Sequence, residues 1–285
     1  MTDHVVPVLR AAWIVLPAVV AAGLSDAIAD RSATVGVAVE PLLWAGWAIG
    51  VVAVLVPRTV SLTVIRTLAP AAVLATAWGA TADDLGVADL AALAAAALVA
   101  TVAMAPQVGA HFIDGSSYGP ERRLPLAPPV ALLFGPVQVA VLTVLGGLAA
   151  GPVLLAARQW VPGGIALVVG PAVAFFAARA LHGLSRRWVV LVPGGIVVHD
   201  ALTLTDPVLL PKEALVAIEP AVVGTEATDL TQRARGLAVE IRLAEPGQFT
   251  LARRGRAEGE AIRTDAVLVT PTLPAPLLAA AHPQT

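Results

Sequence analysis

Residues 162–181 read PGGIALVVGPAVAFFAARAL, and Ser185, Arg186 and Arg187 follow shortly after. This is the last long apolar run of the chain. Its length matches the roughly 20 residues that an α-helix needs to cross the hydrocarbon core of a bilayer. Similar apolar runs dominate the sequence before it, whereas the sequence after it is typical of a water-soluble domain. The stretch therefore predicts where a membrane part ends and a soluble part begins.

The composition supports a membrane protein. The chain has 285 residues, of which 58% are hydrophobic and 13% charged, and its mean hydropathy is +0.82. Soluble globular proteins have about 45–50% apolar and about 25% charged residues. The net charge of −2 gives no electrostatic footprint for nucleic acid. The absence of cysteine excludes disulfides, thiolate metal sites, iron–sulfur clusters and cysteine nucleophiles.

Five earlier runs share this apolar character, so the sequence predicts six transmembrane helices. The runs occupy residues 5–24, 41–56, 62–80, 87–105, 130–148 and 165–181. The first run has a second interpretation as a cleaved secretory signal peptide, because Arg10 precedes its apolar core and small residues follow it near Ser25.

The distribution of charge predicts the orientation of the six helices. Alternate segment ends carry Arg10, Arg58, Arg122, Arg123, Arg186 and Arg187. The opposite ends carry Arg31 and Arg158 among the acidic residues Asp26, Asp30, Glu40, Asp83, Asp84 and Asp89. Short loops rich in arginine face the cytoplasm. We therefore expect a multi-pass protein of the plasma (inner) membrane with both termini in the cytoplasm.

Two pairs of glycines lie four residues apart within apolar runs, Gly46 with Gly50 and Gly147 with Gly151. Glycines at this spacing share one helix face and let another backbone approach closely. The spacing has two interpretations. It marks either packing inside one bundle, which we favour, or the contact face of a homo-oligomer.

The sequence pattern changes after the last apolar run. Residues 188–192 and 196–199 are rich in β-branched side chains and flank a Pro-Gly-Gly turn, which indicates a hairpin. Residues 237–243 alternate between apolar and polar side chains, as a half-buried strand does. A turn at 244–247 should end this strand, and residues 274–281 predict a short closing helix. We expect a small β-rich domain at 184–285.

This C-terminal part resembles the bacterial pleckstrin-homology-like (PH-like) domains that are attached to membrane helices. The resemblance rests on residues 187–192 (RWVVLV), 195–198 (GIVV), 209–218 (LLPKEALVAI) and 272–274 (TLP). The whole chain, through residues 114–123 (DGSSYGPERR), also resembles uncharacterised polytopic membrane proteins of high-GC actinobacteria. These resemblances imply a fold and a location but no activity. We expect residues 188–283 to fold when expressed alone.

The polar link at 107–128 is the first candidate for a functional site, because it is long for a connection between helices. Its candidate ligand or headgroup contacts are His111, Asp114, Ser116, Tyr118, Glu121, Arg122 and Arg123. The two arginines should lie at headgroup level, where guanidinium groups bind phosphate or carboxylate in a fork, or they serve only as an orientation signal. His111 and Asp114 alone do not make a metal site, and no nucleophile elbow accompanies Ser116.

Other arginines provide further candidates. Arg66 lies inside the third apolar run, where an ionised group is functional by default. It also lies only about 6 Å of helix rise beyond Leu62, so it can extend to the interface instead. Arg253, Arg254 and Arg256 form a basic cluster for the membrane surface, with Arg233 and Arg235 in an earlier loop. At an anionic surface each gains about 1 kcal/mol; a solvated loop is the other interpretation.

The predicted architecture is an α-helical membrane bundle of six transmembrane helices at 1–183, followed by a small cytoplasmic β-rich PH-like domain with a C-terminal helix at 184–285. The leading function is a non-catalytic scaffold or regulatory component of the cell envelope. A transporter or lipid-handling component with its inner mouth at 107–128 is the first alternative. A membrane enzyme acting on a lipid-linked substrate is the second. We expect anionic headgroups and a protein partner of the C-terminal domain as ligands, and no cofactor, metal or nucleic acid.

Overall fold

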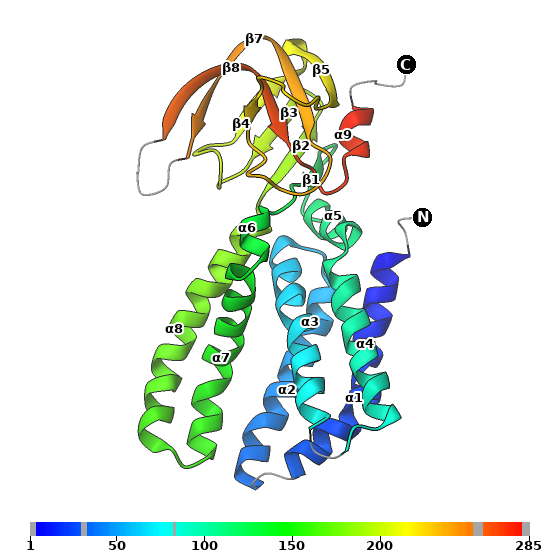
Figure 1. Cartoon of the computed structure of the whole chain (residues 1–285), viewed down its shortest axis with the longest axis vertical. Coiled ribbons are helices and arrows are strands. Elements are labelled where there is room, and N and C mark those ends of the chain that lie inside the picture. Colours follow the sequence, from blue (N-terminus) through cyan, green and yellow to red (C-terminus); the bar gives the residue numbers. More distant parts are fainter. Residues whose placement is uncertain (1–3, 30–32, 82–83, 253–258, 281–285) are drawn as a thin grey trace. The chain divides into compact units, whose positions relative to one another are not determined.

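The chain forms two compact units in a computed structural model, which describes residues 4–29, 33–81, 84–252 and 259–280 (Figure 1). The helical unit comprises Met1–Val108 and Gln138–His182. The β-rich unit comprises Gly109–Val137 and Gly183–Thr285. Each unit is therefore assembled from two separate stretches of sequence. The division predicted between residues 183 and 184 had instead assigned residues 109–137 to the membrane part.

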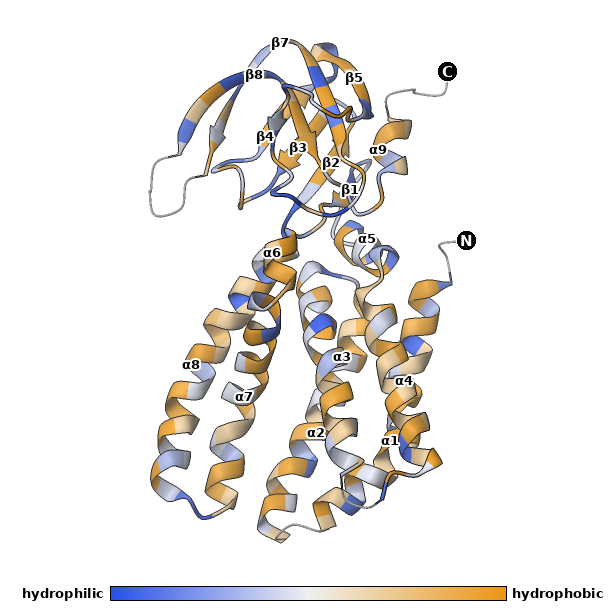
Figure 2. Cartoon of the chain, in the orientation of Figure 1, coloured by the Kyte–Doolittle hydropathy of each residue, from blue (hydrophilic) through white to orange (hydrophobic). Residues whose placement is uncertain are grey.

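Six helices are long and apolar enough to cross a membrane. They are α1 (Val5–Ala29), α2 (Ala33–Leu55), α3 (Thr59–Gly79), α4 (Val87–Met104), α7 (Pro136–Ala156) and α8 (Trp160–Leu184). Hydrophobic residues predominate along these helices (Figure 2). The prediction of six transmembrane helices is confirmed, and the chain is a multi-pass membrane protein.

The observed helices differ in their bounds from the predicted runs. Helices α1 and α2 extend far into the link predicted at residues 25–40, and Pro41 lies within α2. Proline is tolerated in such helices because neighbouring groups satisfy the freed backbone carbonyl. The fifth run also starts later than predicted. A separate short helix, α6 (Val130–Leu133), is broken from α7 at Gly135, whose φ of +117° no side chain readily adopts.

Close contacts at glycines pack the helices of one chain together. The Trp13 ring of α1 lies against Gly50 of α2. Trp13 Nε1 donates to the Trp47 carbonyl at 3.0 Å, and Trp47 Nε1 donates to the Trp13 carbonyl at 3.1 Å. A Cβ on Gly147 of α7 would come within 2.6 Å of the Gly170 carbonyl of α8. The glycine spacings thus serve packing within the chain, and the homo-oligomer stays a prediction.

Two four-stranded sheets build the β-rich unit. The antiparallel first sheet has the order β1 (Arg122–Pro125), β2 (Trp188–Val192), β3 (Gly195–His199) and β4 (Val208–Pro211). The second sheet has the order β5 (Leu215–Pro220), β7 (Val239–Leu251), β8 (Glu260–Val269) and β6 (Thr228–Asp229). Between the sheets in sequence lies a short 3₁₀ helix, Lys212–Ala214, and the described chain ends with α9 (Ala275–Ala279). A β-rich region with two sheets and a C-terminal helix is thus confirmed.

Two features of the sheets depart from the sequence analysis. Strand β1 comes from the link between α4 and α7, and its residues Arg122 and Pro125 pair with Leu191 and Trp188 of β2. The turn predicted at residues 244–247 is wrong. Strand β7 runs on through it with a register shift between Arg242 and Gly247, as β-bulges allow.

The core of the unit lies between inward-facing side chains of both sheets. Its buried members from the tail are Val189, Ile196, Val198, Leu204, Leu210, Ile218, Leu230, Val239, Ile241, Leu243, Phe249, Val267, Val269 and Leu277. Leu124 and Leu126 of the link are 4% and 6% exposed and belong to the same core. Burying an aliphatic side chain contributes about 1.5–3 kcal/mol. The link is thus a structural part of this unit.

Candidate functional site

The link begins with helix α5 (Pro106–Asp114), and two carboxylates tie the following turn to strand β1. Asp114 accepts hydrogen bonds from Ser117 Oγ at 3.0 Å and from the backbone N–H of Arg123 at 2.9 Å. Glu121 accepts from the backbone N–H of Tyr118 at 2.7 Å and from Arg123 Nη2 at 2.9 Å. Of the candidate residues, the structure brings together Asp114, Glu121 and Arg123.

The electrostatics of Glu121 favour a structural role. The Tyr118 N–H lowers the pKa of the Glu121 carboxyl below its ordinary value, and the Arg123 guanidinium lowers it further. A general acid needs the opposite shift, toward the operating pH. Glu121 is therefore ionised at neutral pH and serves as a hydrogen-bond acceptor.

Arg123 continues a stack of planar side chains across the first sheet. Its guanidinium carbon lies 5.4 Å from the centre of the Trp188 ring. The Trp188 ring stacks on His199, with centroids 4.8 Å apart and planes 12° apart. His199 Nδ1 lies 2.9 Å from the Arg186 carbonyl oxygen, which only accepts hydrogen bonds, so Nδ1 carries a proton. Sequence reasoning missed Trp188 and His199, although they are the outer ends of the two strands predicted at 188–192 and 196–199.

The remaining candidates of the link lie apart from this stack. His111 is exposed on α5 and contacts Phe112 edge to face at 6.1 Å. Tyr118 is 83% exposed, Ser116 is half-buried, and the Arg122 side chain is exposed. Among the described residues, no group of three or more His, Asp or Glu side chains is placed to hold a metal ion.

Arg66 completes the end of a neighbouring helix. Its Nε donates to the Ala103 carbonyl at 3.3 Å, in the last turn of α4. Arg10 of α1 does the same for α2, with Nε 2.9 Å from the Val54 carbonyl. The last carbonyls of a helix lack partners within it and carry partial negative charge. The bond to a helix-terminal carbonyl therefore explains each of these arginines without a bound ligand.

Two polar residues of α8 were missed by the sequence analysis. His182 Nδ1 lies 3.0 Å from Thr63 Oγ1 of α3, which links the two helices. Arg179 stands within the sixth apolar run and its side chain is exposed. Both were readable from the sequence as polar groups near the C-terminal end of this run. Arg253, Arg254 and Arg256 lie outside the described residues.

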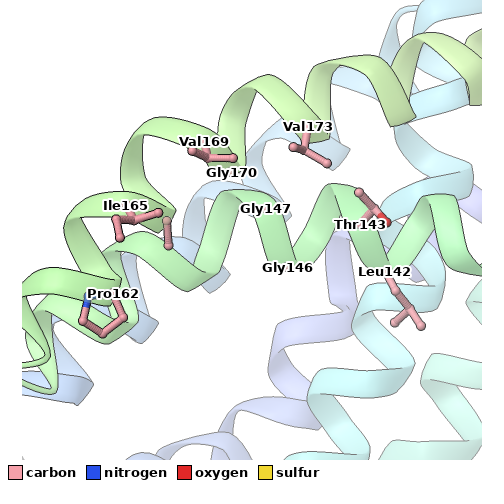
Figure 3. Close-up of a pocket in the computed structure, with 10 residues that line it drawn as sticks. Leu142, Thr143, Gly146, Gly147, Pro162, Ile165, Val169, Gly170 and Val173 are labelled. Carbon is pink, nitrogen blue, oxygen red and sulfur yellow. The ribbon is translucent and has the colours of Figure 1, made fainter.

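A groove runs between α7 and α8 (Figure 3). Its lining is apolar apart from Thr143, with Leu142 on α7 and Ile165, Val169 and Val173 on α8. An apolar groove of this kind contacts lipid acyl chains and gives an ion or a polar cargo no partner.

Comparisons with known proteins add no function. No family model matches the chain, and neither the curated proteins nor the solved structures contain a similar one.

Proposed function

We propose that the chain is a non-catalytic component of the inner membrane whose β-rich, PH-like unit binds a protein partner at the cytoplasmic face. It would act as a scaffold or regulatory component of the cell envelope. The observation that carries the proposal is strand β1, which makes the connection between α4 and α7 a part of the β-rich unit. A connection used in this way is an element of a folded domain and does not form the open entrance of a transport pathway.

Chain connectivity supports a regulatory role. The backbone passes between the helical and β-rich units after Val108, after Val137 and after His182. Only residues 134–135 separate α6 from α7, and residues 185–187 separate α8 from β2. A partner that displaces the β-rich unit therefore acts on several helix ends without a long flexible linker between them.

The chemistry of the link supports a non-catalytic function over the two alternatives. Asp114 and Glu121 already accept hydrogen bonds from their own loop and from Arg123. An enzyme would need at least one of them free as an acid or base. The groove of Figure 3 lacks the ionisable groups that a proton-coupled transporter uses.

The cytoplasmic placement rests on arginines that remain exposed. Arg123 forms an ion pair with Glu121, and Arg187 forms one with Asp200, both inside the β-rich unit. Arg122 and Arg186 are exposed, and Arg58 precedes α3 at the same set of segment ends. The bias that favours a cytoplasmic location of these ends persists without the two paired arginines.

Site-specific photo-crosslinking in cells tests the proposal. A photoreactive residue replaces Leu209 or Val216, which are 54% and 61% exposed on the β-rich unit, or Val168, which is 77% exposed on α8. We expect one recurrent protein adduct from Leu209 or Val216, and lipid adducts from Val168 as the matched control. Protein adducts no more frequent from the β-rich unit than from Val168 would contradict the proposed function.

A further inference from the structure

A loop of the β-rich unit is attached to the start of a transmembrane helix through an aromatic side chain. The Arg235 guanidinium carbon lies 5.7 Å from the centre of the Phe134 ring. An isolated β-bridge pairs Pro129 with Ala234. Phe134 precedes Pro136, the first residue of α7, by two positions. The loop 229–236 is therefore held next to the end of a membrane span, although about a hundred residues separate the two in sequence.

This position corresponds to the lipid headgroups. Two residues of chain extend at most about 7 Å, and each headgroup layer is about 5–8 Å thick. The Phe134 side chain is 70% exposed to the surroundings of the protein. Phe134 has no polar group, so its exposed ring is apolar surface of the kind that lipid covers beside a membrane span.

The loop is built to present positive charge. Asp229 Oδ1 accepts from the Thr231 N–H at 2.7 Å, and Thr231 Oγ1 accepts from the Arg233 N–H at 3.2 Å. Gln232 and Arg233 have φ of +54° and +56°, so they form a tight turn with both side chains exposed. With Asp229 held by its own loop, Arg233 and Arg235 remain directed at the surroundings.

Arg186 adds a third exposed cation at the same end of the helix pair. It follows Leu184, the last residue of α8, by two positions. Helices α7 and α8 are joined by a short turn and pack against each other at Gly147 and Gly170, so the start of α7 and the end of α8 lie together. Its backbone carbonyl oxygen lies 2.9 Å from His199 Nδ1, and its side chain is exposed.

We propose that Arg233, Arg235 and Arg186 form a binding surface for the phosphate of anionic phospholipid headgroups. Guanidinium binds phosphate in a two-point fork, and each arginine near an anionic leaflet contributes about fivefold in affinity, or about 1 kcal/mol. The basic cluster at Arg253, Arg254 and Arg256 lies outside the described residues and stays a separate prediction. It is independent of the protein partner that the proposed function requires.

A single-cysteine label tests the proposal in the full chain. The natural sequence has no cysteine, so Gln232→Cys gives one labelling site within the loop. The labelled protein is placed in nanodiscs of phosphatidylcholine with increasing phosphatidylglycerol, and a quencher on the headgroups reports proximity. We expect quenching that rises with phosphatidylglycerol and falls with salt, because exposed charges are screened. The apparent affinity for phosphatidylglycerol, taken from the dependence of quenching on its content, should fall about fivefold for Arg233→Gln or Arg235→Gln. It should fall about 25-fold for the double variant.

The controls separate lipid recognition from simple proximity. Arg263→Gln on β8, an exposed arginine outside the loop, should leave the quenching unchanged. Arg233→Lys with Arg235→Lys should retain quenching but lose part of the affinity, because Lys lacks the fork. Quenching that is absent, or equal at every phosphatidylglycerol content, would overturn the proposal. Circular dichroism of each variant establishes that it is folded.

Discussion

Arg187 binds Asp200 through two hydrogen bonds, Nε to Oδ1 and Nη2 to Oδ2, each 2.7 Å long. The two side chains are 1% and 0% exposed. Arg187 Nη1 also donates to the Ala127 carbonyl at 3.0 Å, so the pair joins the link between α4 and α7 to the tail. Arg187 is thus a buried structural residue, although the sequence analysis counted it among the orienting charges.

Asp200→Asn should destabilise the β-rich unit strongly. The substitution leaves the buried guanidinium without its counter-charge, and breaking a buried pair costs about 3–5 kcal/mol. Thermal unfolding of the chain in detergent, followed by circular dichroism in the β-sheet region, measures the loss. The double replacement Arg187→Met with Asp200→Leu should recover much of it, since no unpaired charge remains. A change below about 0.5 kcal/mol for Asp200→Asn would contradict this role.

The tail should require residues 109–137 to fold. A fragment of 184–285 lacks β1 together with Leu124 and Leu126, whose burial contributes about 3–6 kcal/mol in total. Whole domains have only about 5–15 kcal/mol of stability. We therefore revise the expectation that 188–283 folds alone. Urea unfolding should show a cooperative transition only when 109–137 is joined to the tail by a flexible linker; equal transitions with and without it would refute the revision.

Glu240 should give the β-rich unit an acid-sensitive component of stability. Hydrogen bonds from Arg242 and then Thr225 lower the pKa of the Glu240 carboxyl below its ordinary 4.5. Because the folded pKa is lower than the unfolded one, the stabilisation is present at neutral pH and is lost as the pH falls below about 4.5. Melting temperatures from about pH 7 to pH 3 should decline less steeply for Glu240→Gln than for the natural chain. An unchanged slope would contradict the assignment. Glu219→Gln is the control, because Glu219 also pairs with Arg242 but its side chain is 54% exposed.

Gly147→Val should weaken the α7–α8 pair, because its Cβ would meet the Gly170 carbonyl. Overpacking of this kind costs about 1–3 kcal/mol. Gly146→Val is the matched control, since a Cβ there meets no atom within 4 Å. The thermal midpoint in detergent should fall for Gly147→Val alone. Equal midpoints for the two variants would argue that the close approach of α7 and α8 has no energetic importance.

The sequence predicted the elements whose signals are local. Apolar runs identified the six spans because a bilayer requires about 20 apolar residues in succession. Alternating side chains at residues 237–243 identified the first part of β7, which begins at Val239. Strand β1 could not be predicted in this way, because it has four residues, includes a proline and pairs with a strand over 60 residues away. A separation of about a hundred residues concealed the contact of Arg235 with Phe134 in the same way. Arg187 and Asp200 lie closer in sequence, but they flank the β2–β3 hairpin, and no local signal pairs their side chains.

The candidate site was predicted less well for a related reason. The link did gather interacting residues, since Asp114, Glu121 and Arg123 form one network. Their proximity in sequence was read as a ligand site, whereas hydrogen bonds to backbone N–H groups show that they hold the turn before β1. Residue type indicates what a side chain is able to bind, and only the fold indicates whether its partners are already present.

Cysteine accessibility measures directly whether the β-rich unit faces the cytoplasm, as we propose. Single cysteines replace Gln159, in the turn between α7 and α8, and Leu202, which is 40% exposed in the β-rich unit. Each single-cysteine variant of the otherwise cysteine-free chain is expressed in cells. The cell wall is removed, and the cells, with the plasma membrane intact, are treated with a membrane-impermeant maleimide. We expect labelling of residue 159 at once and of residue 202 only after the membrane is permeabilised. Labelling of residue 202 in intact cells, with residue 159 protected, would contradict it.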